Sequence, residues 1–414
     1  MKVIIVDEMM GRGKTSAAIN LMNSSDKDER FMYVTPYISE VERVIKSCPQ
    51  KKFKQPENKW TKIMGIKMLL DKGANIATTH SLFHLFDDEI IETCRELGYT
   101  LVMDEVTSVV ENYEIMKDDA NVLLEKYVDV DEETGILRWR ENQKDYNGEK
   151  FAEEKRLCEM ESLAMYGDTI IMWLFPVKIF KAFHTTYILT YLFDGQLQKG
   201  YYDFHNIKYE YMHVGGDSVH SYHFQKEESP VQLNILPLIN IIEDEKLNMV
   251  GSSESSLSKT WYLKNKKTAL TSRLKNNLYS VAVKRETSYN NETGDYEVPR
   301  SKDVIWTTFK DMKDVLKGKG YTKGFIPCNA RATNEYRERN VVAYLINVYM
   351  NPTIKNFFTD KGIIVDEDLY ATSEMIQLIW RSAIRDGKHI TVYIPSIRMR
   401  TLLHNWLAEV SCSN

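Results

Sequence analysis

A glycine-rich loop near the start of the chain carries residue types that hold phosphate. It reads "EMMGRGKTS" at 8–16 and joins the apolar run "KVIIVD" to "KTSAAINLMN", whose Ala and Leu spacing suits a helix. Between a strand and a helix, backbone amides attract phosphate oxygens, a lysine reaches the β- and γ-phosphates, and a hydroxyl holds Mg²⁺. We therefore predict a site for ATP and Mg²⁺, with Thr15 on the metal. The expected loop residues are Gly11, Arg12, Gly13, Lys14, Thr15 and Ser16.

Glu8 departs from the usual phosphate-loop pattern, which has glycine at this position. The first glycine marks where the chain leaves the strand, whereas phosphate contacts come mainly from the later residues. A carboxylate that pointed into the loop would be repelled by phosphate. We expect the site to tolerate Glu8 because its side chain faces outward, toward Arg12.

Two adjacent carboxylates end a second apolar run, "YTLVMDEV" at 99–106. Asp104 would hold Mg²⁺ through water, and Glu105 would orient and deprotonate the water that attacks the γ-phosphate. An Asp-Glu pair alone is more often a solvated helix start. Together with the loop, it predicts a nucleoside triphosphatase.

Further segments follow in an order that resembles the superfamily 2 (DEAD/DEAH-like) helicases, of a compact type common in bacteriophages. They are "MYVTPYISEVERV", "IATTHSLF", "DEVT", "YILTYLFDG", "ATNEYRERNVVAYLINVYMNP" and "QLIWRSAIR". The resemblance implies that Thr190 couples hydrolysis to domain movement. The nucleic-acid contacts that it implies are Thr35, Pro36, Thr79, His80, Thr333 and Asn334. Taken singly, the threonines at strand ends could also be helix caps.

The last of these segments implies three catalytic residues, Gln377, Arg381 and Arg385. The family usually places its second arginine one residue earlier, but on one helix either spacing keeps the side chains on a broad common face. An arginine that reaches the γ-phosphate offers a planar fork of donors. We prefer Arg385 for this role, with Arg381 supporting it. The alternative is a surface helix that carries two arginines.

Many relatives also read adenine through a segment that precedes the first strand. This chain begins at that strand. We therefore expect base discrimination to come from elsewhere or to be slack.

The stretch from Ser258 to Arg285 holds eight Lys or Arg residues and no acid, with aromatic residues interleaved. Such a stretch can follow a phosphate backbone. We predict that Lys264, Lys266 and Lys267 contact nucleic acid. A solvated helix face remains the alternative.

The elements that must position these residues alternate between short strands and helices. Strands are expected near 2–7, 31–35, 75–78, 99–103, 168–174 and 185–191. This alternation predicts an α/β fold with mostly parallel sheets flanked by helices. The resemblance implies two RecA-like P-loop lobes.

We expect the first lobe at 1–225, with an insertion at about 108–167 that includes a hairpin turning at Glu133, Thr134 and Gly135. A tract rich in Gly, Ser and Pro, "HVGGDSVHSYHFQKEESP", predicts the boundary between the lobes. The second lobe then occupies 226–414, with "VIWTTF", "YTKGFIPC" and "HITVYIPS" as strands.

Composition indicates a cytoplasmic protein, in the host cytoplasm if the chain is viral. The five cysteines are scattered, and the longest apolar stretch, "TIIMWLFPVKIF", is too short to span a bilayer. We expect no membrane partner. The net charge of −5 does not by itself indicate a nucleic-acid partner.

The resemblance implies an ATP-dependent helicase or translocase that acts on DNA in phage replication or recombination. The expected partner is single-stranded or forked DNA, with RNA as an alternative and replication proteins as further partners. One rival is a phage terminase-type packaging ATPase, which needs a nuclease lobe; Asp366, Glu367 and Asp368 are the acids available for one. A second rival is a clamp or adaptor with a degenerate ATPase.

Overall fold

The chain folds into two compact units in the computed structural model, which describes residues 1–57, 61–167, 169–228, 235–328 and 335–412. The first unit comprises Met1–Glu228 and Asn351–Val365, and the second comprises Ser229–Met350 and Asp366–Asn414. The chain therefore leaves the second unit once and returns to it. The expectation of an uninterrupted second lobe at 226–414 is wrong for residues 351–365.

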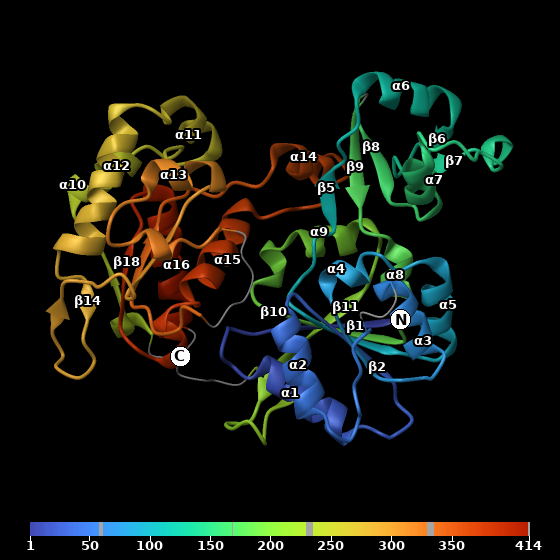
Figure 1. Ribbon diagram of the computed structural model, residues 1–414, viewed down its shortest axis with the longest axis horizontal. Helices are drawn as coiled ribbons and strands as arrows, with labels where there is room; N and C mark the ends of the chain where they lie inside the picture. Colours follow the sequence, from blue (N-terminus) through green and yellow to red (C-terminus); the bar gives the residue numbers. More distant parts are fainter. Residues whose placement is uncertain (58–60, 168, 229–234, 329–334, 413–414) are drawn as a thin grey trace. The chain divides into compact units, whose positions relative to one another are not determined.

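A seven-stranded sheet forms the centre of the first unit (Figure 1), in the order β12-β11-β1-β10-β4-β2-β3. All neighbouring strands are parallel except β11 and β12. The strands are β1 (Lys2–Asp7), β2 (Phe31–Thr35), β3 (Ile76–Thr79), β4 (Thr100–Asp104), β10 (Thr185–Thr190), β11 (Tyr209–Gly215) and β12 (His223–Gln225).

Helices cover both faces of this sheet, which explains why strands such as β1 and β2 are mostly apolar and buried. Along β1, Ile4 and Val6 pack with the buried residues of α1 and α2, whereas Val3 and Ile5 face the opposite cluster. The helices of this unit outside its insertion are α1 (Lys14–Ser24), α2 (Ile38–Ser47), α3 (Lys62–Leu70), α4 (His80–Phe83), α5 (Asp88–Glu96), α8 (Val177–Lys181), α9 (Leu197–Phe204) and α14 (Pro352–Asp360).

An insertion between β4 and β10 builds its own small core. Its strands β5 (Val110–Asn112), β9 (Ile170–Leu174) and β8 (Leu163–Tyr166) form one antiparallel sheet. β6 (Val128–Val130) and β7 (Leu137–Trp139) form the predicted hairpin, and Gly135 has the positive φ of 76° that its turn needs. The helices of the insertion are α6 (Lys117–Lys126) and α7 (Ala152–Glu159).

The strand expected at 168–174 was assigned to the wrong sheet. β9 pairs with β5 and β8, so the insertion continues to Leu174 instead of ending near 167. An apolar run shows that a strand is buried but not which partner it pairs with.

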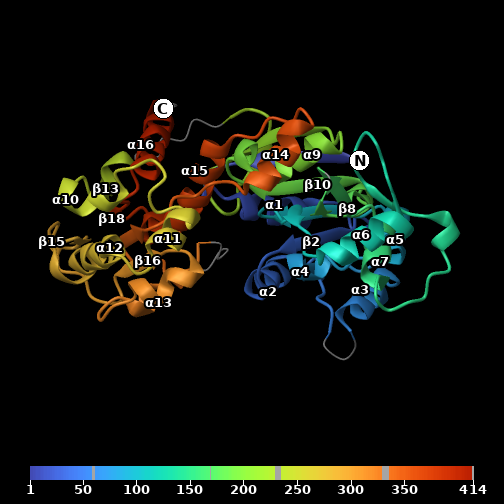
Figure 2. The same ribbon diagram turned by 90° about the horizontal axis from the view of Figure 1, so that it is seen from above.

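Helix α14 belongs to residues 351–365, the segment that returns to the first unit, and it packs into the core of that unit. Phe357 and Phe358 are fully buried in the larger apolar cluster there. Phe358 lies against Gly200 of α9, where an added Cβ would be 3.4 Å from the ring, and Figures 1 and 2 both draw α14 beside α9. This packing explains why 351–365 belongs to the first unit.

The second unit has a four-stranded parallel sheet in the order β13-β18-β17-β16. The strand expected within "YTKGFIPC" is replaced by a short 3₁₀ turn and one isolated bridge between Trp306 and Phe325. The strands and the hairpin are β13 (Ile239–Ile241), β16 (Val304–Thr307), β17 (Val341–Tyr344), β18 (Ile390–Tyr393), β14 (Ser288–Tyr289) and β15 (Tyr296–Glu297). The helices are α10 (Glu245–Asn248), α11 (Lys259–Asn265), α12 (Ala269–Tyr279), α13 (Lys313–Leu316), α15 (Glu367–Ile379) and α16 (Ile397–Cys412).

These two units confirm the predicted α/β class with mostly parallel sheets flanked by helices. Within the described residues, no helix is both long and apolar enough to cross a membrane.

Candidate active site

Polar side chains end five neighbouring strands of the first sheet at the same edge. The register pairs Asp7 with Thr190, and Thr35 with Thr79. It also pairs Leu189 with Asp104, which ends β4. Because parallel strands end on the same side of a sheet, these residues form one row outside the carboxyl ends, where open α/β sheets bind ligands.

The glycine-rich loop lies at this edge, between β1 and α1. Gly11 and Gly13 have φ values of 85° and 84°, which residues with a side chain rarely adopt. α1 begins at Lys14, so the first amides of the helix have no helical acceptor and point toward the loop. The loop therefore offers donors and a helix N-terminus to an anion.

Lys14 turns its ammonium group back over this loop. Its Nζ donates to the carbonyl oxygens of Met9, at 3.2 Å, and of Glu8. Burial lowers the pKa of Lys14, while the carboxylates of Glu105, Asp7 and Asp104 oppose this shift. The ammonium group is thus held among acids and loop carbonyls, in position for a phosphate.

Glu8 turns its carboxylate away from the phosphate-binding side of the loop, toward β11 and the side chain of Arg12. Its Oε1 accepts a hydrogen bond from the backbone amide of Val214 at 3.2 Å and lies 3.3 Å from Nδ1 of His213. Its Oε2 lies 3.9 Å from Nε of Arg12. The expected outward orientation is confirmed, and the main partner is a neighbouring strand.

Asp104 and Glu105 stand two strands away from the loop, at the end of β4. Tyr33 of β2 donates its hydroxyl to Oδ2 of Asp104 at 2.9 Å. Burial, together with the neighbouring Glu105, raises the pKa of Asp104 to about 6. A divalent cation beside Asp104 would favour the deprotonated form. A buried carboxylate next to a second carboxylate therefore suits a metal ligand.

Glu105 has a left-handed backbone with φ of 68°, which is rare for a residue that carries a side chain. Its amide donates to the carbonyl of Leu189 at 2.9 Å, which ties the turn to β10. Strained residues of this kind concentrate at functional sites. This conformation is consistent with a turn that directs the Glu105 carboxylate toward a ligand at the edge of the sheet.

Asp7 was not among the predicted site residues. Its carboxylate accepts the backbone amides of Leu192 at 2.7 Å and Phe193 at 2.9 Å, so it fixes the chain that follows Thr190. Burial raises its pKa, and the two amides oppose that rise. The sequence signal was present, since Asp7 is the polar residue that ends the first apolar strand.

A second group of missed residues surrounds the last residue of "DEVT". Thr107 Oγ1 lies 2.6 Å from Nε2 of His84, and the Thr107 amide donates to Oε1 of Gln198 at 3.0 Å. Gln198 in turn donates to the hydroxyl of Tyr202 at 2.8 Å. These contacts join the acidic segment to the region after β3 and to α9.

The predicted nucleic-acid contacts of the first unit differ in exposure. The Thr35 and His80 side chains are buried, whereas Pro36 and Thr79 are half-buried. Among the described residues, Oγ1 of Thr35 and Oγ1 of Thr190 are buried without a hydrogen-bond partner. Buried hydroxyls of this kind usually find a partner, so they suit an edge that binds a polar ligand or water. The expected contacts Thr333 and Asn334 lie outside the described residues.

The catalytic residues expected in the second unit do not share one helix. α15 ends at Ile379, so Arg381 and Arg385 follow it, and the expected common helical face with Gln377 is wrong. Arg381 is 7% exposed, while Arg385 is exposed on the short 3₁₀ turn that follows. Gln377 lies within the helix, and its Nε2 donates to Oγ of Ser373 at 3.2 Å.

The predicted lysines Lys264, Lys266 and Lys267 are exposed at the end of α11 and just after it. Within the part of the chain that the structure describes, these lysines form no ion pair. Leu263 is 71% exposed and lies beside them. The side chains are therefore accessible, as a backbone-tracking role requires.

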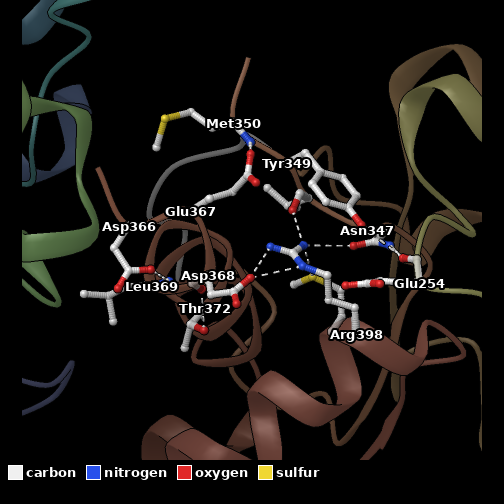
Figure 3. Close-up of polar contacts among 12 residues, drawn as sticks. Glu254, Asn347, Tyr349, Met350, Asp366, Glu367, Asp368, Leu369, Thr372 and Arg398 are labelled. Carbon is white, nitrogen blue, oxygen red and sulfur yellow. Dashed lines mark hydrogen bonds and ion pairs between the residues drawn. The ribbon is translucent and has the colours of Figure 1, made fainter. Parts of the chain in front are cut away.

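The acids that a nuclease would need are occupied in another way (Figure 3). Asp366 caps α15 by accepting the amide of Leu369 at 2.8 Å, and Glu367 accepts the amide of Met350 at 3.1 Å. Asp368 pairs with Nη2 of Arg398 at 2.6 Å. These contacts secure the chain where it leaves and re-enters the second unit, which gives each acid a structural role.

Known proteins resemble this chain over nearly its full length. The SPbeta prophage-derived uncharacterized protein YonV of Bacillus subtilis (strain 168) is 39% identical over 423 residues, which cover 98% of each chain. The chain belongs to the YonV family. The YonV middle domain matches residues 110–173, which correspond to the insertion, and the YonV C-terminal Rossmann-like domain matches 233–407.

Two solved structures are similar at a lower level. An XPD helicase has a TM-score of 0.47 and 10% identity, covering all of this chain and 95% of the other. The Xpd4 protein of S. tokodaii has a TM-score of 0.47 and 12% identity, with coverage of 98% and 94%.

Proposed function

We propose that this member of the YonV family is an ATP-dependent helicase or translocase for nucleic acid. One observation carries the proposal: a phosphate-type loop and an acidic pair lie at the same edge of one parallel sheet. Lys14 and Asp104 belong to different segments of the sequence, yet β1 and β4 end at the same edge with only β10 between them. The same combination supports ATP and Mg²⁺ as ligands.

Each residue at this edge has a role that its chemistry supports. The loop amides and Lys14 would hold the β- and γ-phosphates, and Thr15 and Asp104 would hold Mg²⁺. Bound Mg²⁺ would neutralise charge that develops on the phosphates. Glu105 would accept a proton from the attacking water.

The second unit would contribute the remaining catalytic groups. Arg385 is the better candidate to reach the γ-phosphate because it is exposed, whereas the buried Arg381 would support the local fold. Gln377 would assist from α15. In this proposal both units are RecA-like lobes, and Thr190 couples hydrolysis to their movement.

Nucleic acid would be held mainly through its backbone. The proposed contacts are the half-buried Pro36 and Thr79 and the three exposed lysines that follow Leu263. Contacts of this kind carry no sequence information and make affinity depend on salt. Single-stranded or forked DNA of a phage replication or recombination pathway is the proposed substrate.

A strand-displacement assay tests this function. Labelled DNA and RNA duplexes, each with a 5′ or a 3′ overhang, should be incubated with the protein, Mg²⁺ and ATP, with Lys14→Ala as the control. We expect ATP-dependent displacement of at least one substrate by the parent protein and none by the variant. No displacement, together with an ATPase that nucleic acid does not stimulate, would contradict the proposal.

A further inference from the structure

β11, β12 and the turn between them lie beside the phosphate loop, and they include most of the tract that was expected to hold the boundary between the lobes. We call these residues, 209–225, the wall. β11 and β12 extend the first sheet on the far side of β1 from the acidic pair. The turn between them, at 216–222, is closed by Ser221, whose amide and hydroxyl bond to Ser218 and Asp217. Gly, Ser and Asp are therefore here to build a tight turn.

Three contacts attach this wall to the loop and to α1. Asn20 of α1 donates through Nδ2 to the carbonyl oxygens of Val219 and Tyr222, both at 2.9 Å. Glu8 accepts the amide of Val214, as described above. The turn is thus held from the loop and from the helix that follows it.

The third contact is the ring of Tyr222 against Gly13. A Cβ added to Gly13 would lie 2.6 Å from Cδ2 and Cε2 of Tyr222, which is closer than real contacts allow. Glycine is therefore required at this position both by its backbone conformation and by the ring. Tyr222 itself is half-buried, and its side chain also packs against the core cluster that contains Ala17 and Ala18 of α1.

The strand order gives the direction in which a bound nucleotide would extend. The γ-phosphate must face Asp104 and Glu105, which lie beyond β10 on one side of β1. The rest of the nucleotide must then extend to the other side, where β11 and β12 lie. Ser16, beside the α-phosphate end of such a loop, and Asn20 share one face of α1, and Asn20 holds the Tyr222 carbonyl.

We infer that Tyr222 is the stacking platform for the base of the bound nucleoside triphosphate. The inference rests on the proposed ATP site and adds the part of that site which reads the base. Because every base has a π-face, a stacking ring holds a purine without selecting among purines.

Binding measurements with three ligands test this platform. ATP, GTP and inorganic tripolyphosphate, each with Mg²⁺, should be titrated calorimetrically into the parent protein and its Tyr222 variants. Tyr222→Ala should weaken ATP and GTP by about tenfold to a hundredfold, the usual scale for losing one base–aromatic stack. Affinity for tripolyphosphate should not change, because it has no base.

Two further variants separate stacking from folding. Tyr222→Leu keeps an apolar cover on Gly13 but has no π-face, so it should behave as the alanine variant does. Tyr222→Phe keeps the ring and should restore parental affinity. His220→Ala removes an exposed side chain from the same turn and should change nothing.

The outcomes distinguish this inference from the proposed function. ATP binding that requires Lys14 but is unaffected in the alanine and leucine variants of Tyr222 would overturn the platform alone. An equal loss of ATP and tripolyphosphate would also overturn it, because the ring would then only shape the loop. A parent protein that binds neither ligand through Lys14 would overturn the ATP site as well.

Discussion

Replacing Asp104 by asparagine should make the protein more stable when nucleotide and Mg²⁺ are absent. Burial raises the pKa of Asp104 to about 6 from its ordinary value of 3.8. A carboxyl with a raised pKa binds its proton more tightly in the folded state, so stability falls as pH rises from about 4 through about 6. Above that window the folded protein carries the full cost of the buried charge. Asparagine removes the charge and can still accept the hydrogen bond from Tyr33.

The size of the effect follows from the two pKa values. A tenfold change in proton affinity is worth about 1.4 kcal/mol, so the difference between 3.8 and about 6 corresponds to about 3 kcal/mol at neutral pH. For a unit of this size, each kcal/mol shifts the melting temperature by about 2–4 °C. The first unit should therefore melt several degrees higher in Asp104→Asn.

Thermal unfolding at a series of pH values measures this effect. The stability difference between variant and parent should be largest at pH 7.5 and should vanish near pH 4, where the parent carboxyl is also protonated. Asp71→Asn, which removes an exposed carboxylate, should show no comparable gain. A variant no more stable than the parent at pH 7.5, or a gain that persists at pH 4, would contradict this prediction.

Three further predictions follow from the two units. GTP should be hydrolysed within about tenfold of ATP, a gap of ~1.4 kcal/mol, and a thousandfold preference in steady-state assays would mean that a base-selective element exists. Arg385→Ala should lower turnover by about a thousandfold with ATP binding retained, whereas Arg381→Ala should mainly lower the melting temperature; normal turnover in the former would contradict the assignment. Replacing Lys264, Lys266 and Lys267 by Ala should flatten the slope of log affinity against log salt by roughly 0.7 per lost contact, while Arg at the same positions should preserve it. Fluorescence anisotropy with a labelled oligonucleotide measures this slope, and an unchanged slope in the alanine variant would indicate a solvated face.

Local chemistry made the first strands and the phosphate loop predictable. β1 and β2 are buried on both faces, so their sequences are apolar runs that end in a polar residue. The loop needs glycine at positions 11 and 13 because both have positive φ. Signals of this kind depend only on nearby residues, and the sequence carries them in full.

The pairing partners of some strands, and the return of residues 351–365 to the first unit, could not be predicted, because they depend on contacts between residues far apart in the sequence. β9 has the composition of a core strand, yet it pairs within the insertion. The tract at 213–230 does contain the division between the two units, after Glu228, but its first part pairs as β12 with β11 and completes the first sheet. Nothing periodic marks 351–365 as part of the first unit; only the burial of Phe357 and Phe358 reveals it.

The side-chain contacts of the site were predicted only in part. Lys14 and Asp104 are recognisable because their motifs are short and contiguous. Tyr33 lies inside an apolar strand, and its hydrogen bond to Asp104 joins residues far apart in the sequence. Tyr222 contacts Gly13, but most of the sequence of the first unit lies between the two residues, so no local pattern could indicate the contact.

The most direct test of the account compares Glu105→Gln with the parent protein in two assays. We propose that the edge of the first sheet hydrolyses ATP and that Glu105 accepts the proton of the attacking water. Equilibrium binding of ATP should be retained, whereas steady-state turnover should fall by about two to four powers of ten, the usual scale for removing acid–base help. Lys14→Ala should lose both binding and turnover. Near-parental ATPase activity in purified, folded Glu105→Gln protein would contradict the account.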